Sequence, residues 1–258
     1  MDPIDALIRA LAVREHREIA YRALLQAGAK AVPGLVRAAA TEPEHGDPTY
    51  SARGVLAVLG SLAVPSLIGG LAVREHGRCP ASAVLRSLGG VAVPYLRQAL
   101  DHPDPLVREQ AAVTLGLIPD VGPQALATLA ERLGDGDERV CLAVAEALEL
   151  HEDLGFVPDW KRLVPVVGRI YATAGLRLRA ALLRLLPSAG RQASPLMPQL
   201  LATVEDDREE LRLPVVRVLE AIGPDAVAAL PLLERLNRHS TGPLRMAVED
   251  AISALSGR

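Results

Sequence analysis

The sequence predicts an all-α protein built from repeated pairs of helices, and three observations lead to this prediction. A proline preceded by an apolar residue recurs along the 258-residue chain, often at intervals of about 33 residues. An apolar residue followed by arginine recurs about 14 residues after these prolines. Each such marker opens an Ala- and Leu-rich stretch whose apolar residues repeat every three to four positions, which is the helical pattern.

The first 27 residues are expected to form an incomplete helix pair, with Val13-Arg14 in the marker position. From about Gly28 to Arg258 the markers define seven units, each consisting of a helix, a polar turn and a second helix. Ala127 takes the place of proline in one unit. The prolines that mark the first helices are Pro33, Pro65, Pro94, Pro165, Pro198 and Pro231.

In the later units the second helix begins at a marker. These markers are Val107-Arg108, Val140-Cys141, Leu178-Arg179, Leu211-Arg212 and Leu244-Arg245.

One pair of helices is too small to bury its own apolar faces, so neighbouring pairs must stack into a continuous core. We therefore expect a single domain over residues 1–258, with an irregular joint near 150–162, where the proline frame slips.

The stretch VAVPYLRQALDHPDPLVREQAAVTLGLI and its later copies resemble HEAT repeats, in particular the short bacterial HEAT-like repeats named after phycobilisome-lyase proteins. The resemblance covers essentially the whole chain. It implies a right-handed α-solenoid of about seven to eight HEAT-like helix pairs. In that family the marker arginine packs in a ladder with an aspartate between the helices. By resemblance, Asp104 and Asp207 would partner the structural arginines, which are Arg108, Arg179, Arg212 and Arg245.

The resemblance also implies that the second helix of each pair lines the concave face of the solenoid. An exposed apolar surface with arginines at its rim suits a protein or peptide partner. If the register is off by one position, the apolar residues of this set belong to the core instead. The expected partner-binding residues are Leu142, Glu146, Leu183, Arg184, Leu213, Val216, Arg217 and Met246.

The irregular joint holds the only tryptophan and the only phenylalanine of the chain. An exposed aromatic loop beside carboxylates is a candidate recognition element. The residues of this candidate element are His151, Glu152, Phe156 and Trp160. Alternatively, Phe156 and Trp160 form a hydrophobic joint and fill a gap between two stacks of repeats.

The composition and charge of the chain argue against some classes of function. Hydrophobic residues make up 50% of the chain, charged residues 23% and aromatic residues 2%, and the formal net charge is −3. A globular protein is expected, and nucleic-acid binding is not, because the chain lacks a basic surplus and a base-stacking surface. The histidines and the two cysteines stand in non-equivalent frames, so we expect no metal and no cofactor. An acidic start and the lack of a long apolar stretch favour a cytoplasmic protein without membrane contact.

Two functional hypotheses follow. The favoured one is a non-catalytic scaffold that binds a protein or peptide on the second helices. The alternative is an enzyme or carrier that holds a hydrophobic small molecule in the same groove. A HEAT-like DNA glycosylase fits less well, because the expected groove is mixed in charge. The sequence sets neither the partner nor the oligomeric state.

Overall fold

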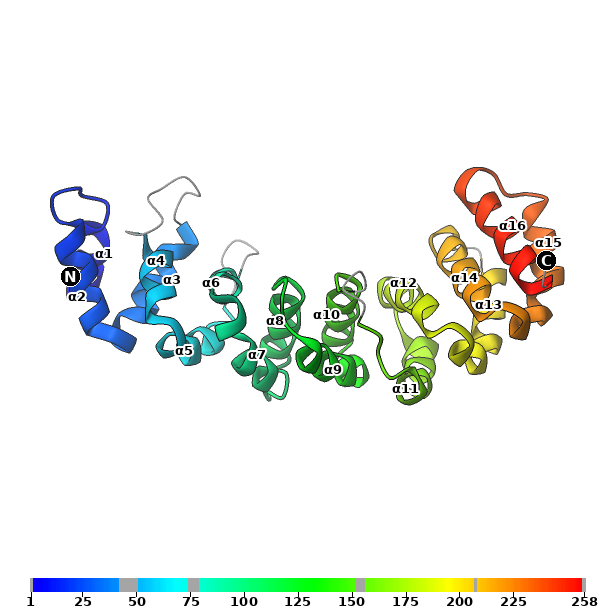
Figure 1. The fold of residues 1–258 in the computed structure, drawn as a ribbon, viewed down its shortest axis with the longest axis horizontal. Coiled ribbons are helices and arrows are strands. Elements are labelled where there is room, and N and C mark those ends of the chain that lie inside the picture. Colours follow the sequence, from blue (N-terminus) through cyan, green and yellow to red (C-terminus); the bar gives the residue numbers. More distant parts are fainter. Residues whose placement is uncertain (1, 42–50, 74–78, 152–155, 207, 257–258) are drawn as a thin grey trace. The chain divides into compact units, whose positions relative to one another are not determined.

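The computed structural model describes residues 2–41, 51–73, 79–151, 156–206 and 208–256. Within these ranges the chain forms α-helices joined by turns and short 3-10 helices, without a β-strand (Figure 1). The fold class is therefore all-α, as the periodicity predicts. Contacts divide the chain into two compact units, unit 1 (Met1–Ala125) and unit 2 (Leu126–Arg258).

Unit 1 consists of short helices that pack in two rows. Helices α2, α4, α6 and α8 contact one another in sequence order, and α1, α3, α5 and α7 do the same. Each odd-numbered helix also packs against the even-numbered helix that follows it. The helices are α1 (Pro3–Ala10), α2 (Arg17–Ala27), α3 (Val32–Thr41), α4 (Ala52–Leu59), α5 (Val64–Gly69), α6 (Pro80–Leu88), α7 (Val93–Ala99) and α8 (Pro105–Gly116).

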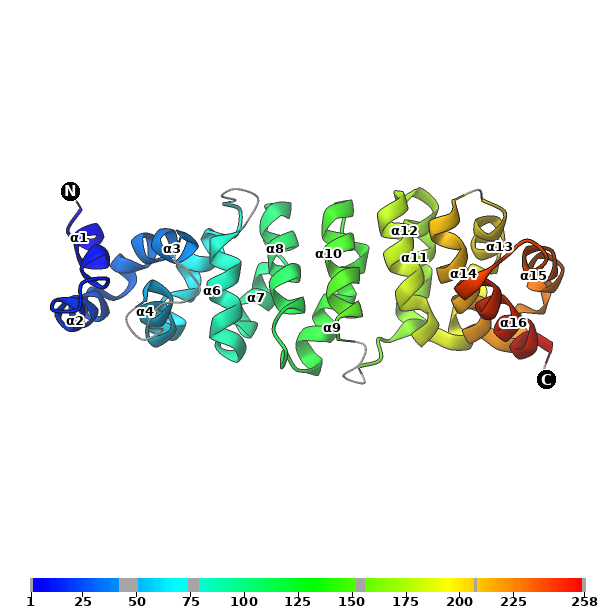
Figure 2. The same cartoon turned by 90° about the horizontal axis from the view of Figure 1, so that it is seen from above.

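Unit 2 has the same two-row arrangement with mostly longer helices (Figure 2). We call α10, α12, α14 and α16 the helix-B row, because each is the second helix of its pair. Helix α9 begins at the end of unit 1. The elements are α9 (Pro123–Glu131), η5 (Arg132–Gly134), α10 (Glu138–Glu149), α11 (Trp160–Thr173), α12 (Leu176–Leu185), η7 (Leu186–Leu196), α13 (Met197–Glu205), α14 (Glu209–Ile222), η8 (Gly223–Ala229), α15 (Leu230–Asn237) and α16 (Gly242–Ser256).

Most of the recurring prolines mark helix starts, whereas Pro165 lies inside α11. Pro65, Pro94, Pro198 and Pro231 occupy the first or second positions of α5, α7, α13 and α15. Proline is tolerated there because its missing N–H has no partner within the helix in any case. At the opposite end, Gly223 stops α14 with a φ of 71°, a conformation that side chains with a Cβ rarely adopt.

The apolar residue points into the core at four of the markers, whereas Val13 of the first marker is 42% exposed. Val107, Val140, Leu178 and Leu211 are at most 2% exposed. Leu244, on the last helix described, is only half-buried. Stacked repeats bury their apolar faces against neighbours, so a marker on the outermost helix keeps more exposed surface than those inside the stack.

Candidate partner-binding surface

Three columns of side chains cross the helix-B row. The outer column follows each marker directly and consists of Leu142, Ala180, Leu213 and Met246. The inner column lies three residues further along each helix and consists of Ala145, Leu183, Val216 and Glu249. The charged column comes one residue later again and consists of Glu146, Arg184, Arg217 and Asp250.

The outer column is an apolar surface that becomes more exposed toward the carboxyl end. Leu142 and Ala180 are half-buried, whereas Leu213 is 37% and Met246 66% exposed. The helices contact one another, so their outer-column side chains follow one another across the row. These residues are therefore accessible to a partner, and their role in binding stays a prediction.

The inner column corrects part of the expected surface. Leu183 and Val216 are fully buried and cannot contact a partner. At about 100° per residue, a side chain three positions on is rotated by about 60° from the outer column. That rotation directs it toward the neighbouring helix. Glu249 is exposed on α16, which no later described helix covers.

The charged column is accessible but engaged in ion pairs. Arg184 Nε lies 2.7 and 2.9 Å from the two carboxylate oxygens of Glu149 on α10. Arg177 of α12 lies 3.7 Å from Glu146 of α10. The arginines and acids of the column thus face partners on neighbouring helices of the row.

Arg217 forms a similar cluster on α14. Its Nη1 lies 2.7 Å from Glu220 and 3.6 Å from Asp250 on α16. The hydrogen bond to Glu220, together with the negative charges of Glu220 and Asp250, raises the pKa of Arg217. Arg184 and Arg217 are therefore not free rim arginines, because carboxylates of this chain contact both.

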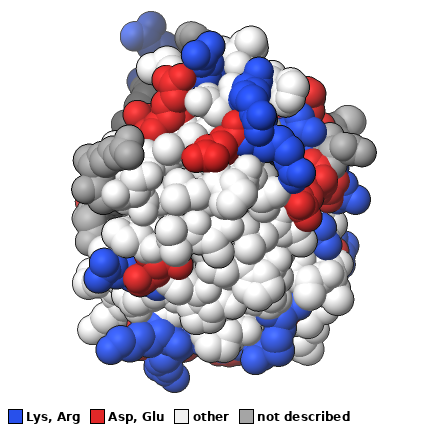
Figure 3. Space-filling view, turned by 90° about the vertical axis from the view of Figure 1, so that its right-hand side faces the viewer, with Lys and Arg blue, Asp and Glu red and all other residues white. Residues whose placement is uncertain are grey.

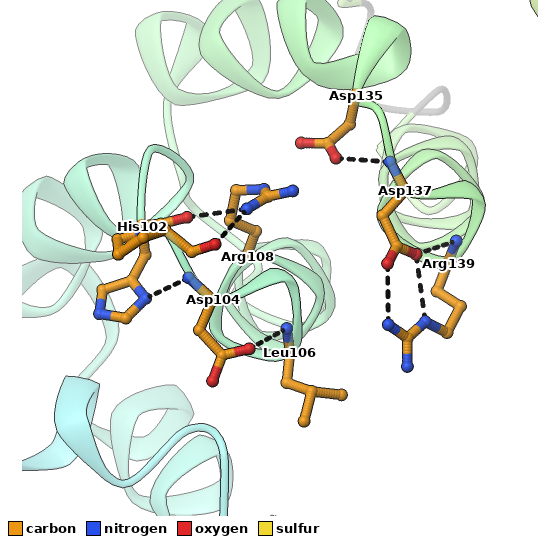
Figure 4. Close-up of polar contacts among 8 residues, drawn as sticks. His102, Asp104, Leu106, Arg108, Asp135, Asp137 and Arg139 are labelled. Atoms are coloured by element: carbon orange, nitrogen blue, oxygen red, sulfur yellow. Dashed lines mark hydrogen bonds and ion pairs between the residues drawn. The ribbon is translucent and has the colours of Figure 1, made fainter.

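The contacts described for Arg108 and Arg179 are with backbone carbonyls, where the resemblance implies a ladder with aspartates. Arg108 Nη1 donates to the backbone carbonyls of His102 at 2.9 Å and Pro103 at 3.1 Å (Figure 4). Asp104 instead accepts from the backbone N–H of Leu106 and caps α8. Asp207 lies outside the described residues. Arg108 therefore satisfies carbonyls that follow α7, which have no partner within that helix.

Arg179 repeats this contact in unit 2. It donates to the carbonyls of Tyr171 at 3.1 Å and Ala172 at 3.3 Å, near the end of α11. Cys141 fills the same position on α10, and its thiol donates to the Asp135 carbonyl at 3.2 Å. Burial, followed by the charge of Asp135, raises the pKa of Cys141 to about 11. The thiol thus replaces the guanidinium as a neutral donor.

The two last markers differ from this pattern. Arg212 lies 3.7 Å from Glu209 of its own helix. Arg245 donates to Glu249 at 2.9 Å on the surface of α16. The ladder expected from the resemblance therefore becomes a set of carbonyl contacts at Arg108 and Arg179, and local ion pairs at Arg212 and Arg245.

The end of unit 2 formed by α15 and α16 carries a broad surface without charged residues, with charges mostly toward its rim (Figure 3). Met246 of the outer column belongs to α16 and is largely exposed. Leu232, Leu244 and Ile252 of these two helices are half-buried. Exposed apolar side chains are thus concentrated near the carboxyl end of the outer column.

The joint between α10 and α11 divides the predicted recognition loop. His151 is 2% and Trp160 1% exposed, so both pack in the interior and neither is a surface contact. Phe156 is half-buried, and Glu152 lies outside the described residues. The burial of Trp160 agrees with the alternative of a hydrophobic joint, and Phe156 keeps part of its surface exposed.

A cavity of about 640 Å³ lies beside this joint, and we call it the α9–α11 groove. Its lining includes Ala130 and Glu131 of α9, Phe156 and Val157 of the joint, and Arg162 of α11. This groove is not among the sites predicted from the sequence. The signal available was the unusual pair of aromatic residues in a chain with 2% aromatics.

The described residues include no cluster of three or more His, Cys, Asp or Glu side chains arranged to hold a metal ion. Among the helices described, none has both the length and the hydropathy needed to span a membrane.

Comparisons with known proteins agree with this architecture. Residues 78–149 match the family model of HEAT repeats. The structure resembles that of an engineered protein at a TM-score of 0.55, with 15% identity, covering 88% of this chain and 96% of that one. A designed armadillo repeat protein in complex with the peptide (KR)4 matches at a TM-score of 0.52, with 16% identity, covering 98% and 100%.

Computationally designed armadillo repeat proteins for modular peptide recognition match at a TM-score of 0.53, with 15% identity, covering 86% and 99%. No curated protein matches the sequence. Residues 78–149 therefore resemble HEAT repeats, and the chain has the all-α solenoid fold seen in the similar armadillo structures.

Proposed function

We propose that the protein is a non-catalytic scaffold that binds a partner protein or peptide on the helix-B row of unit 2. One observation carries the proposal: Leu142, Leu213 and Met246 form an accessible apolar column on helices that pack side by side. Apolar side chains aligned in this way on a surface typically mark an interaction site.

The spacing of the helices suggests how a partner would engage. Packed helices lie about 8–10 Å apart, and seven residues of a partner helix rise about 10.5 Å. A partner helix with apolar residues seven positions apart would therefore place one against each outer-column residue. An extended segment with apolar residues three positions apart also fits, at about 3.3 Å per residue.

The charges of the row favour an apolar partner over a strongly charged one. The similar armadillo design is in complex with the peptide (KR)4. In this chain Glu146 and Glu149 face Arg177 and Arg184, so the row offers few free carboxylates to a basic peptide. We therefore expect apolar side chains of the partner to supply most of the affinity.

The alternative, a hydrophobic small molecule held in the same groove for catalysis or transport, has less support. It requires Leu142, Leu183 and Leu213 to line one open pocket. Leu183 has no exposed surface, so it cannot contribute to a pocket on that face.

The proposal is tested by affinity capture of the tagged protein from source-cell extract, read by mass spectrometry. The informative variant is Leu213→Glu with Met246→Glu, because both positions are exposed and tolerate charge. Val227→Glu is the matched control, since Val227 is 55% exposed but lies on η8, outside the row. We expect a partner that is retained by wild type and by the control and lost by the double variant.

A partner captured equally by all three proteins would contradict binding through the outer column. A small molecule that co-purifies in the native mass spectrum, without a protein partner, would favour the alternative. Circular dichroism of each variant checks that its helical content is unchanged.

A further inference from the structure

We propose that the α9–α11 groove is a second docking site, which takes an extended peptide segment carrying an apolar side chain next to a lysine or arginine. The groove is lined by residues of α9, α11 and the joint, and by none of the outer column. It is therefore independent of the surface proposed above.

The groove has an apolar floor and an apolar wall. Ala130 and Leu163 are buried beneath it, and Val166 is half-buried. Phe156 and Val157 form the wall, and Val157 is 65% exposed. A phenylalanine and a valine that keep this much surface inside a concavity are suited to receive an apolar side chain.

The fold anchors this wall on the side that leads into α11. Trp160, three residues after Val157, is buried. The backbone N–H of Trp160 also donates to the Pro158 carbonyl at 2.8 Å, which makes a tight turn directly after Val157. Val157 is therefore exposed next to an anchored turn.

The charges at the groove indicate that the bound peptide should also carry a cationic side chain. Glu131, Asp159 and Arg162 line it and are exposed, and none forms an ion pair with another described residue. This contrasts with the helix-B row, where Arg184 is held by Glu149. Two unpaired carboxylates against one guanidinium give an acidic balance, so the groove favours a cationic side chain beside the apolar one.

The openness of the site favours a chain segment over a small molecule. A volume of about 640 Å³ falls in the range of ordinary ligand sites. Small-molecule sites usually enclose most of the ligand, whereas the wall residue Val157 and the three charged residues here are exposed to solvent. An extended peptide can cross such a site and leave it on either side.

Two short peptides test the proposal directly. The probe is acetyl-Ala-Lys-Leu-Lys-Ala-amide, and its charge-reversed control is acetyl-Ala-Glu-Leu-Glu-Ala-amide. Binding is followed by the methyl NMR signals of Val157 and Leu163 and by the emission of Trp160, the only tryptophan. We expect the lysine peptide to bind about tenfold more tightly than the glutamate peptide, since two exposed charge pairs each contribute a few-fold.

Variants locate the site. Phe156→Ala should weaken the lysine peptide by about tenfold, and Glu131→Lys should reduce the preference for lysine to about threefold or less. Glu234→Lys is the matched control, because Glu234 is exposed on α15, away from the groove. The pair Leu213→Glu and Met246→Glu should leave peptide binding unchanged, which separates this site from the helix-B row.

Equal affinity for the two peptides would overturn the proposal. So would unchanged binding by Phe156→Ala, or no signal change with the lysine peptide at about 1 mM. If hexylamine binds as tightly as the lysine peptide, the occupant is a small amphipathic amine and the peptide assignment is wrong.

Discussion

The inner and outer columns of the helix-B row differ only by three positions in the sequence, yet they have opposite environments. Leu183 and Val216 of the inner column are fully buried, and Leu213 and Met246 of the outer column are exposed. The residue types are similar, so hydrophobicity alone does not separate them. The difference teaches that in stacked repeats the next helix decides which apolar residues become core.

The last helix supports this interpretation. Its inner-column position holds Glu249, which is exposed and pairs with Arg245. A carboxylate is acceptable there because no later described helix covers it, whereas the same charge on α12 or α14 would be buried without a partner. A side chain at the inner-column position is therefore buried when a neighbouring helix covers it, and its position within the helix pair does not decide this alone.

The largest effect is expected from truncating the inner column. Leu183→Ala should lower the free energy of unfolding by about 2–5 kcal/mol, because it leaves a cavity between packed helices. The matched change Leu213→Ala in the outer column should cost less than about 1 kcal/mol. Urea unfolding of both variants measures the contrast, and similar losses would break the distinction between the columns.

The marker position gives a second contrast of the same kind. Arg108→Ala should cost about 1–3 kcal/mol of unfolding free energy, because carbonyls after α7 lose a charged donor. Arg245→Ala removes only an exposed pair with Glu249 and should cost less than about 1 kcal/mol. Chemical denaturation is again the measurement, and a larger loss for Arg245→Ala would contradict the assigned contacts.

Cys141 adds a dependence on pH. Its pKa is about 11 in the folded protein against 9.0 for a free thiol, so the folded state favours the neutral form. The stability contributed by the thiol is present below pH 9 and is lost as the pH rises toward 11. The difference in unfolding free energy between wild type and Cys141→Ala should therefore shrink over this interval, and a constant difference would argue against a buried thiol donor.

The smallest effect is expected in the charged column. Arg184→Ala removes an exposed pair with Glu149 and should cost about 0.2–1 kcal/mol at low salt and less at high salt. Unfolding at two salt concentrations measures it. A large loss that does not depend on salt would show that Arg184 packs as part of the core.

Much of the fold could be predicted from the sequence, because the proline and marker positions carry a direct physical meaning. Most of the recurring prolines, though not Pro165, lie at helix starts, and the marker residues Val107, Val140 and Leu178 are core. The register on the helix-B row was harder to predict. Leu183 and Leu213 are both leucines, and only the path of the next helix decides which of them is buried. Outer-column residues were identified, while Leu183 and Val216 were wrongly included.

The joint between α10 and α11 could also be predicted only in part from the sequence. Phe156 and Trp160 were recognised as unusual, but the sequence could not say which of them is buried. The α9–α11 groove depends on how α9, the joint and α11 converge, and its residues are spread from Ala127 to Val166. No local pattern in the sequence connects them.

The most direct test of the partner surface is oxidative footprinting of methionine, with and without the captured partner. Met246 is 66% exposed in the outer column, and Met197 is half-buried at the start of α13 and serves as the internal control. The bound partner should slow the oxidation of Met246 and leave the oxidation rate of Met197 unchanged. Equal oxidation of Met246 in the free and bound protein would contradict this prediction.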